Sequence, residues 1–188
     1  MSPTHRVIDR RGGIEQTEHV FDSPVLGIDP GLTSCGLATI TRRDGRPTLG
    51  AAIAVRTPTD LAEPGRLRLV FDAVRDAIAE HRPGSVAIER VAWNTNQVSA
   101  MHVARATGAI LLAAAGARLP VDEYGPLEVK MAVTGQGNAS KAQVRSALER
   151  LHGIRDLPTQ PDAVDAVAVA VCHLTQLRLK RSATLAAR

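Results

Sequence analysis

The sequence predicts a three-layer α/β domain with a mixed five-stranded sheet and helices on both faces. The apolar run VLGID is followed by two strand-like segments, SCGLATITRR and RPTLGAAIAVRT, which Asp44-Gly45, a dipeptide typical of hairpin turns, separates. Further along the chain, segments with helical spacing alternate with two more short apolar runs. Three antiparallel strands followed by alternating helices and parallel strands indicate a mixed sheet covered on both faces.

The individual elements follow from local patterns. The first helix carries apolar residues at helical spacing and ends at Pro83-Gly84. A later helix is capped by Asn138 or Ser140, and the last one has Pro161 in its first turn. We expect strands at 25–29, 34–43, 46–57, 85–89 and 119–124, and helices at 63–84, 96–119, 126–135, 138–151 and 161–179.

Length and composition favour one domain. A chain of 188 residues, 44% hydrophobic and 22% charged, fits one domain with a buried core. Residues 1–22 are polar and without period, so we expect a disordered arm outside the fold. The folded domain is expected over 23–178, and residues 179–188 are expected to form a flexible basic tail.

Charge and cysteine usage narrow the partners and the compartment. Lysine and arginine exceed the acids by 23 to 19, which gives a net charge of +4 and favours polyanionic partners. No uninterrupted apolar run approaches the roughly 20 residues of a membrane span, and no apolar leader begins the chain, so we expect a cytoplasmic protein without membrane association. Cys35 and Cys172 lack a C-x-x-C motif and are expected to be reduced core residues.

Four carboxylates are placed so that they should converge. VLGID and SVAIE end in Asp29 and Glu89, and neighbouring strands lie about 4.7–4.9 Å apart. The D-x-x-D spacing of Asp162 and Asp165 places both on one face of the last helix, whose apolar AVAVAVC segment must pack on the sheet. Like charges so close together repel each other unless a cation is bound.

Each acid also has a simpler explanation. Asp29 could be a turn residue before Pro30-Gly31, Asp162 could favour the helix dipole, and Glu89 could pair with Arg90 or Arg105. A single metal site accounts for all four acids together. Carboxylates without nearby histidine or cysteine favour Mg²⁺ or Mn²⁺, and two such ions suit phosphodiester hydrolysis. The sequence therefore predicts a metal-dependent nuclease.

Four segments resemble the RuvC family of Holliday junction resolvases. They occur in the family's order over residues 24–174: VLGIDPGLTSCG, SVAIERV, GPLEVKMAVTGQGNASKAQV and PDAVDAVAVAVCH. The resemblance implies a ribonuclease H-like fold and a homodimer that nicks four-way DNA junctions in symmetric pairs with Mg²⁺. It also implies action with the branch-migration complex of the same recombination and repair pathway.

The resemblance also implies roles for particular residues. By motif match, the catalytic and metal-binding acids are Asp29, Glu89, Asp162 and Asp165, and Lys130 and Lys141 contact DNA near the scissile phosphate. Family members usually carry an aromatic residue two positions after Arg90, where this chain has Ala92, with Trp93 next to it. Trp93 therefore either stacks on bases as a shifted wedge or covers the core.

The remaining DNA-contacting residues are expected around these. Asn94 in the polar NTNQ segment would reach bases by hydrogen bonds, and Arg90, Arg105 and Arg145 would face phosphates unless they are merely solvated. The dimer contact is expected on the helix at 96–119, whose small residues permit close approach, although they could equally serve packing on the sheet.

Three other functions share part of this pattern. A kinase or actin-like ATPase opens with a similar strand and turn but needs a second domain, for which 188 residues leave no room. A junction-binding protein without cleavage would not need the four acids. A nuclease with the same metal centre but acting on flaps or RNA-containing duplexes stays open.

Overall fold

The computed structural model describes residues 23–90 and 97–186, with side chains described as far as Leu177. Its five strands form one sheet in the order β3-β2-β1-β4-β5. β1 (Val25–Asp29) pairs antiparallel with β2 (Ser34–Arg43), and β2 pairs antiparallel with β3 (Arg46–Arg56). β4 (Ser85–Glu89) lies parallel to β1, and β5 (Val121–Tyr124) lies parallel to β4. The predicted mixed sheet is confirmed.

The hairpin between β2 and β3 turns at the predicted dipeptide. Asp44 and Gly45 have φ angles of 51° and 78°. Positive φ at both central residues matches the right-handed twist of the two strands, and Asp-Gly accepts it at low cost. The turn therefore lies at the end of β2 farthest from Ser34.

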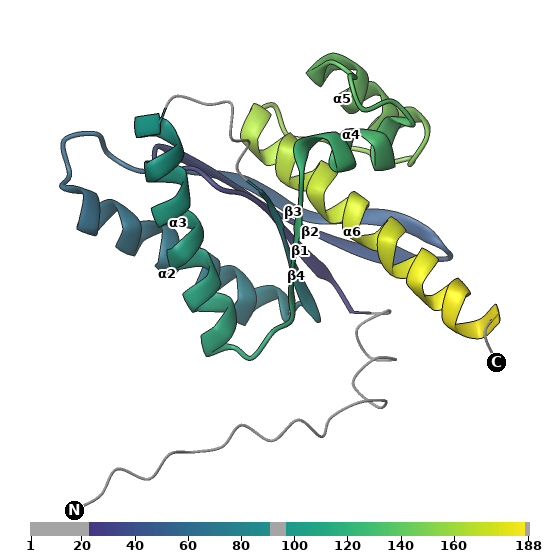
Figure 1. Ribbon diagram of the computed structural model, residues 1–188, viewed down its shortest axis with the longest axis horizontal. Helices are drawn as coiled ribbons and strands as arrows, with labels where there is room; N and C mark the ends of the chain where they lie inside the picture. Colours follow the sequence, from purple (N-terminus) through teal and green to yellow (C-terminus); the bar gives the residue numbers. More distant parts are fainter. Residues whose placement is uncertain (1–22, 91–96, 187–188) are drawn as a thin grey trace, which may run out of the picture.

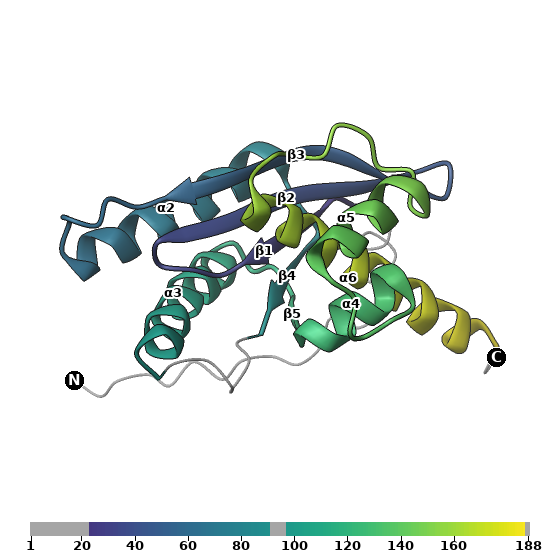
Figure 2. The same cartoon turned by 90° about the horizontal axis from the view of Figure 1, so that it is seen from above.

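Two helical layers sandwich the sheet (Figures 1 and 2). α2 (Glu63–His81) and α3 (Gln97–Gly116) cover one face. α6 (Pro161–Ala186) crosses the other face, with α4 (Pro126–Thr134) and α5 (Lys141–Arg150) outside it. Alternation along the strands fills both cores: Leu26 and Ile28 face α2 and α3, whereas Val25 faces α6.

Some element ends differ from the sequence-based expectation. Of the two caps expected for α5, the structure selects Ser140, because Ser140 Oγ accepts from the Gln143 amide (3.3 Å) and the Gln143 side chain accepts from the Ser140 amide. α6 ends at Ala186 rather than at residue 179, since the added stretch contains strong helix formers and no glycine or proline. The predictions for residues 1–22, Trp93 and Asn94 concern positions outside the described residues.

α3 is the helix that by length and composition could cross a membrane among those the structure describes. One side of α3 packs in the core. Its buried residues are Ala106, Ile110, Ala113 and Ala114. Only 22% of its most apolar stretch is buried, so the opposite side of the helix is an exposed apolar face. Such a face needs a partner, and the expectation that this partner is not a membrane stays a prediction.

Candidate active site

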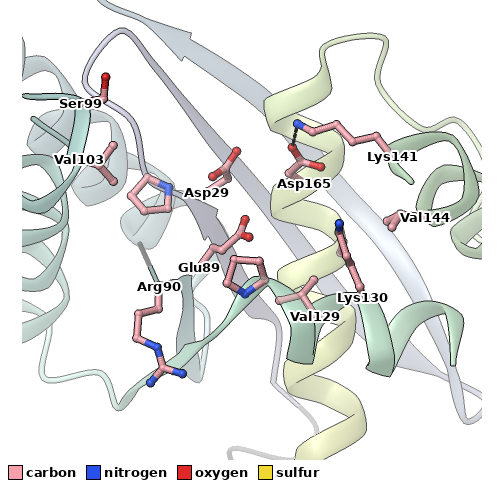
Figure 3. A pocket seen from close by; sticks show the side chains of 13 residues that line it. Asp29, Glu89, Arg90, Ser99, Val103, Val129, Lys130, Lys141, Val144 and Asp165 are labelled. Carbon is pink, nitrogen blue, oxygen red and sulfur yellow. Dashed lines mark hydrogen bonds and ion pairs between the residues drawn. The ribbon is translucent and has the colours of Figure 1, made fainter. Parts of the chain in front are cut away.

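Asp29 and Glu89 meet at one edge of the sheet. They end β1 and β4, which run parallel with Ile28 opposite Ile88, so the two acids leave the sheet side by side. Both belong to the set of alternating positions that faces α6. Figure 3 shows their carboxylates pointing into the same space.

Two glycines bring the N-terminal end of α6 down onto this edge. A Cβ atom at Gly27 in β1 would overlap the Ala166 carbonyl oxygen and lie 2.7 Å from Ala170 Cβ. A Cβ atom at Gly36 in β2 would overlap the carbonyl oxygen of Asp162. The absence of side chains at both positions lets the helix backbone rest directly on the strands.

The helix thereby completes an acidic cluster. One carboxylate oxygen from each of Asp29, Asp162 and Asp165 can be chosen so that all three lie within 4.8 Å of one another. Glu89 lines the same cavity as Asp29 and Asp165. Clustered carboxylate oxygens at this spacing are the ligand type that Mg²⁺ and Mn²⁺ prefer, so the residues fit a hard divalent cation.

The electrostatics of the cluster indicate the same need for a cation. Burial, followed by the charges of Glu89 and Asp165, raises the pKa of Asp29 to about 8. Burial and the charge of Asp165 raise the pKa of Glu89 to about 7. Without added positive charge, part of this cluster is protonated at neutral pH.

Two lysines border the acids. Lys141 Nζ lies 2.5 Å from Asp165 Oδ2, and this hydrogen bond raises the pKa of Lys141. Lys130 lines the same cavity, and in Figure 3 its ammonium group points toward the acids from α4. The cavity has a volume of about 390 Å³ and is open to solvent, so anionic groups can approach both lysines.

Ser34 is a site residue that the sequence analysis missed. Its Oγ donates a hydrogen bond to Asp162 Oδ2 at 2.5 Å. Ser34 lies 128 residues from Asp162, and no local pattern connects the two. The hydrogen bond orients a carboxylate of the cluster from outside it, as supporting residues do in metal sites.

The alternative partner of Glu89 is excluded. Arg90 pairs with Glu128 (Nη2–Oε2, 3.2 Å), and Arg105 pairs with Glu63 (Nη1–Oε1, 2.7 Å). Neither arginine neutralises Glu89, so the carboxylate is not explained as half of a local ion pair.

The predicted arginines therefore lie in different surroundings. Arg90 lines the cavity, whereas Arg105 joins α3 to α2. Arg145 donates to the carbonyl oxygens of Pro158 (2.8 Å) and Leu157 (3.3 Å) and thus holds the segment before α6. The structure brings the two lysines and Arg90 to the cavity and does not bring Arg105 or Arg145 there. DNA contact by any of these residues stays a prediction.

A buried polar group fixes α6 against the sheet behind the acids. His173, 1% exposed, contacts Ser85 Oγ through Nε2 (2.9 Å) and the Tyr124 hydroxyl through Nδ1 (2.8 Å). These contacts join the helix to the start of β4 and to β5. The one sequence signal for this role was a histidine inside an otherwise apolar helical stretch. Cys35 and Cys172 are buried and unpaired, as predicted.

The strand order and the acids from β1, β4 and α6 define the class of the protein as an α/β domain of the ribonuclease H-like type. Residues 25–173 match the family model described as crossover junction endodeoxyribonuclease RuvC. The chain therefore belongs to the RuvC family of endodeoxyribonucleases, and the resemblance inferred from its motifs is confirmed.

Individual relatives support the assignment. The chain is 48% identical over 150 residues to the crossover junction endodeoxyribonuclease RuvC of Nocardia farcinica. The aligned region covers 79% of each of the two chains. It is 45% identical over 169 residues to that of Salinispora arenicola, covering 87% of this chain and 97% of the relative. Thermus thermophilus RuvC in complex with Holliday junction substrate superimposes with a TM-score of 0.79 at 31% identity, over 84% of this chain and 96% of that one. The yeast mitochondrial Holliday junction resolvase Ydc2, at 14% identity and a TM-score of 0.62, shares the fold.

Proposed function

We propose that the protein resolves four-way DNA junctions by cutting two strands of like polarity. The observation that carries this proposal is the cluster of Asp29, Asp162 and Asp165 within 4.8 Å, with Glu89 in the same cavity. The structure of Thermus thermophilus RuvC in complex with Holliday junction substrate, whose protein is 31% identical to this chain, supports four-way DNA as the substrate. The four acids argue for cleavage rather than for binding alone.

We further propose two Mg²⁺ ions per site, with Mn²⁺ as a substitute, held by Asp29, Glu89, Asp162 and Asp165. When bound, the ions supply activation of a water molecule and stabilisation of the leaving oxygen. The acids hold and orient this centre. Lys141 and Lys130 are placed to hold the scissile phosphate, since their ammonium groups border the same open cavity.

The exposed face of α3 supports a homodimer. Its apolar side chains Val98, Met101 and Leu112 are 63%, 54% and 65% exposed. Within the part of the chain that the structure describes, a Cβ atom at Gly108 would meet nothing within 4 Å, so bare backbone is available for close helix contact. A second copy would cover this face, and a two-fold pair would present two metal centres to a roughly two-fold junction.

We make three further proposals, on base contacts, on backbone contacts and on the cellular setting. Trp93 and Asn94 follow the strand that carries Glu89, and we place them at the junction bases. Arg90, Arg105 and Arg145 are proposed to face the DNA backbone. We also propose that the protein works in the cytoplasm with the branch-migration complex of the recombination pathway.

The proposal is tested by mapping cuts on three DNA substrates. The purified protein is mixed with Mg²⁺ and a synthetic immobile four-way junction, a flap or a linear duplex. We expect symmetric nicks confined to the junction, with ends that a ligase reseals, and no cutting in the presence of EDTA. Preferred cutting of the flap would overturn the junction assignment. Cutting that survives EDTA would overturn the metal site.

A further inference from the structure

A second polar cavity lies at the opposite end of the hairpin from the acids. It has a volume of about 310 Å³ and lies between the β2–β3 turn and the segment after α5. We call it the hairpin cavity. Its lining residues are Gly45, Arg46, Pro47, Arg150, Leu151, His152 and Gly153.

The walls of the hairpin cavity are fixed by local structure. The turn has two residues with positive φ, and Gly153 also has a positive φ of 69°. His152 Nε2 donates to the Val133 carbonyl oxygen (2.9 Å), which ties the segment after α5 to the end of α4. Cβ atoms at Gly45 and Gly153 would meet nothing within 4 Å, so a ligand can approach the backbone at both positions.

Two cations of this cavity have no partner among the described residues. Within residues 23–90 and 97–177, neither Arg46 nor Arg150 forms a side-chain hydrogen bond or an ion pair, unlike Arg90, Arg105 and Arg145. Glu149, the acid next to Arg150, is engaged by Arg145 (3.4 Å). Two free guanidinium groups on one cavity are suited to an oxyanion such as phosphate.

The position of the cavity indicates where this phosphate comes from. β2 starts at Ser34, which contacts Asp162, and ends nine residues later at Arg43, next to the hairpin turn. At about 3.4 Å per residue the strand spans about 30 Å. DNA advances about 3.4 Å per base pair, so this length equals about nine base pairs. A duplex arm that leaves the acidic cluster along this side of the molecule would reach the hairpin cavity within one helical turn.

We propose that the hairpin cavity binds a backbone phosphate of a junction arm about one helical turn from the cut, through Arg46 and Arg150. This inference rests on the proposed junction-cleaving function. It assigns the cavity to arm binding, and it gives the two arginines no part in the chemistry at the acids.

The test combines variants of the protein with neutralised phosphates in the DNA. Junctions carrying a single methylphosphonate at successive positions up to twelve base pairs from the cut are bound in EDTA by the full chain and by R46Q/R150Q. We expect the wild type to lose affinity by about three- to tenfold at one or two positions about one turn from the cut. The variant should bind the unmodified junction about tenfold more weakly, with a salt slope lower by about 1–2, and should lose nothing further at those positions.

A matched control removes two charges on the other side of the sheet. Arg82 and Arg118 are exposed residues with positive φ at the ends of α2 and α3, and asparagine accepts that conformation. R82N/R118N should show the same dependence of affinity on methylphosphonate position as the wild type. Identical scans for the wild type and R46Q/R150Q would overturn the inference. A wild-type protein that binds junctions no better than linear duplex would instead overturn the proposed function itself.

Discussion

Ser34 Oγ donates a hydrogen bond to Asp162 Oδ2 at 2.5 Å and thereby joins the start of β2 to the first turn of α6. The contact acts on the acidic cluster from a residue that is not itself a carboxylate. An oriented carboxylate loses less rotamer freedom when it binds a cation than a freely rotating one. Ser34 is therefore a positioning residue for Asp162.

Ser34→Ala should weaken divalent-cation binding to the metal-free protein. Losing a group that orients a metal ligand typically costs about 10- to 100-fold in affinity. Calorimetric titration with Mn²⁺ measures this without any substrate. Ser99→Ala is the matched control, because Ser99 lines the same cavity without a hydrogen bond to the acids. Equal Mn²⁺ affinities of the wild type and Ser34→Ala would show that the hydrogen bond has no such role.

Asp29→Asn should stabilise the metal-free protein at neutral pH. The pKa of Asp29 is raised from 3.8 to about 8, so between these values the folded state binds more protons than the unfolded state. The contribution of Asp29 to the free energy of unfolding of the metal-free wild type therefore falls as pH rises from about 4 to about 8, and stays level above. Asp29→Asn removes this charge and should raise the free energy of unfolding at pH 8 by about 1–3 kcal/mol. Each kcal/mol corresponds to roughly 2–4 °C in melting temperature.

Thermal unfolding in EDTA at a series of pH values measures this effect. The pKa of Glu89 is raised to about 7, so the stability of the Asp29→Asn variant still falls with rising pH, but less steeply. Exposed Asp60 provides the control, since Asp60→Asn should leave the pH profile unchanged. Adding Mg²⁺ should reverse the order of stability at pH 8, because only the wild type gains from full metal binding. If the stability difference between Asp29→Asn and the wild type in EDTA does not widen as pH rises from about 5 to about 8, the argument is wrong.

The sequence was sufficient for features that depend on local pattern. Asp44-Gly45 specified the hairpin because few dipeptides accept two positive φ angles. Asp29 and Glu89 could be placed together because both end short apolar runs, and parallel strands bring such ends to one edge. The spacing of Asp162 and Asp165 fixed their common helix face.

Features that depend on three-dimensional contacts could not be predicted in the same way. Glu89 had Arg90 next to it in sequence, yet Arg90 pairs with Glu128, 38 residues away. An arginine side chain reaches several neighbours, and only the position of α4 after β5, the strand that pairs with β4, selects one of them. The role of Ser34 depends in the same way on how closely α6 approaches β2, which Gly36 permits.

Gly27→Ala should separate α6 from β1 and open the acidic cluster. The added methyl group would overlap the Ala166 carbonyl oxygen, which is backbone and cannot rotate away. Overpacking of this kind costs about 1–3 kcal/mol of stability. We expect a lower melting temperature together with weaker Mn²⁺ binding, which calorimetry measures on the folded variant. Gly116→Ala, at the open end of α3, is the control and should change neither. If Gly27→Ala binds Mn²⁺ as tightly as the wild type, the close packing of α6 on β1 does not determine the geometry of the acidic cluster.

Gly108→Glu should convert the proposed dimer into monomers. A Cβ atom at residue 108 would meet nothing within 4 Å among the described residues, and glutamate favours a helix by roughly 0.5–1 kcal/mol over glycine, so the fold should not be weakened. In a dimer that buries the exposed face of α3, the same side chain would place a charge between two helices. Sedimentation velocity at micromolar concentration should show half the wild-type mass, and junction cutting should lose its paired character. Leu69→Glu, at a 40% exposed apolar position on α2, is the control and should leave the mass unchanged. A Gly108→Glu variant that keeps the wild-type mass would move the interface away from α3.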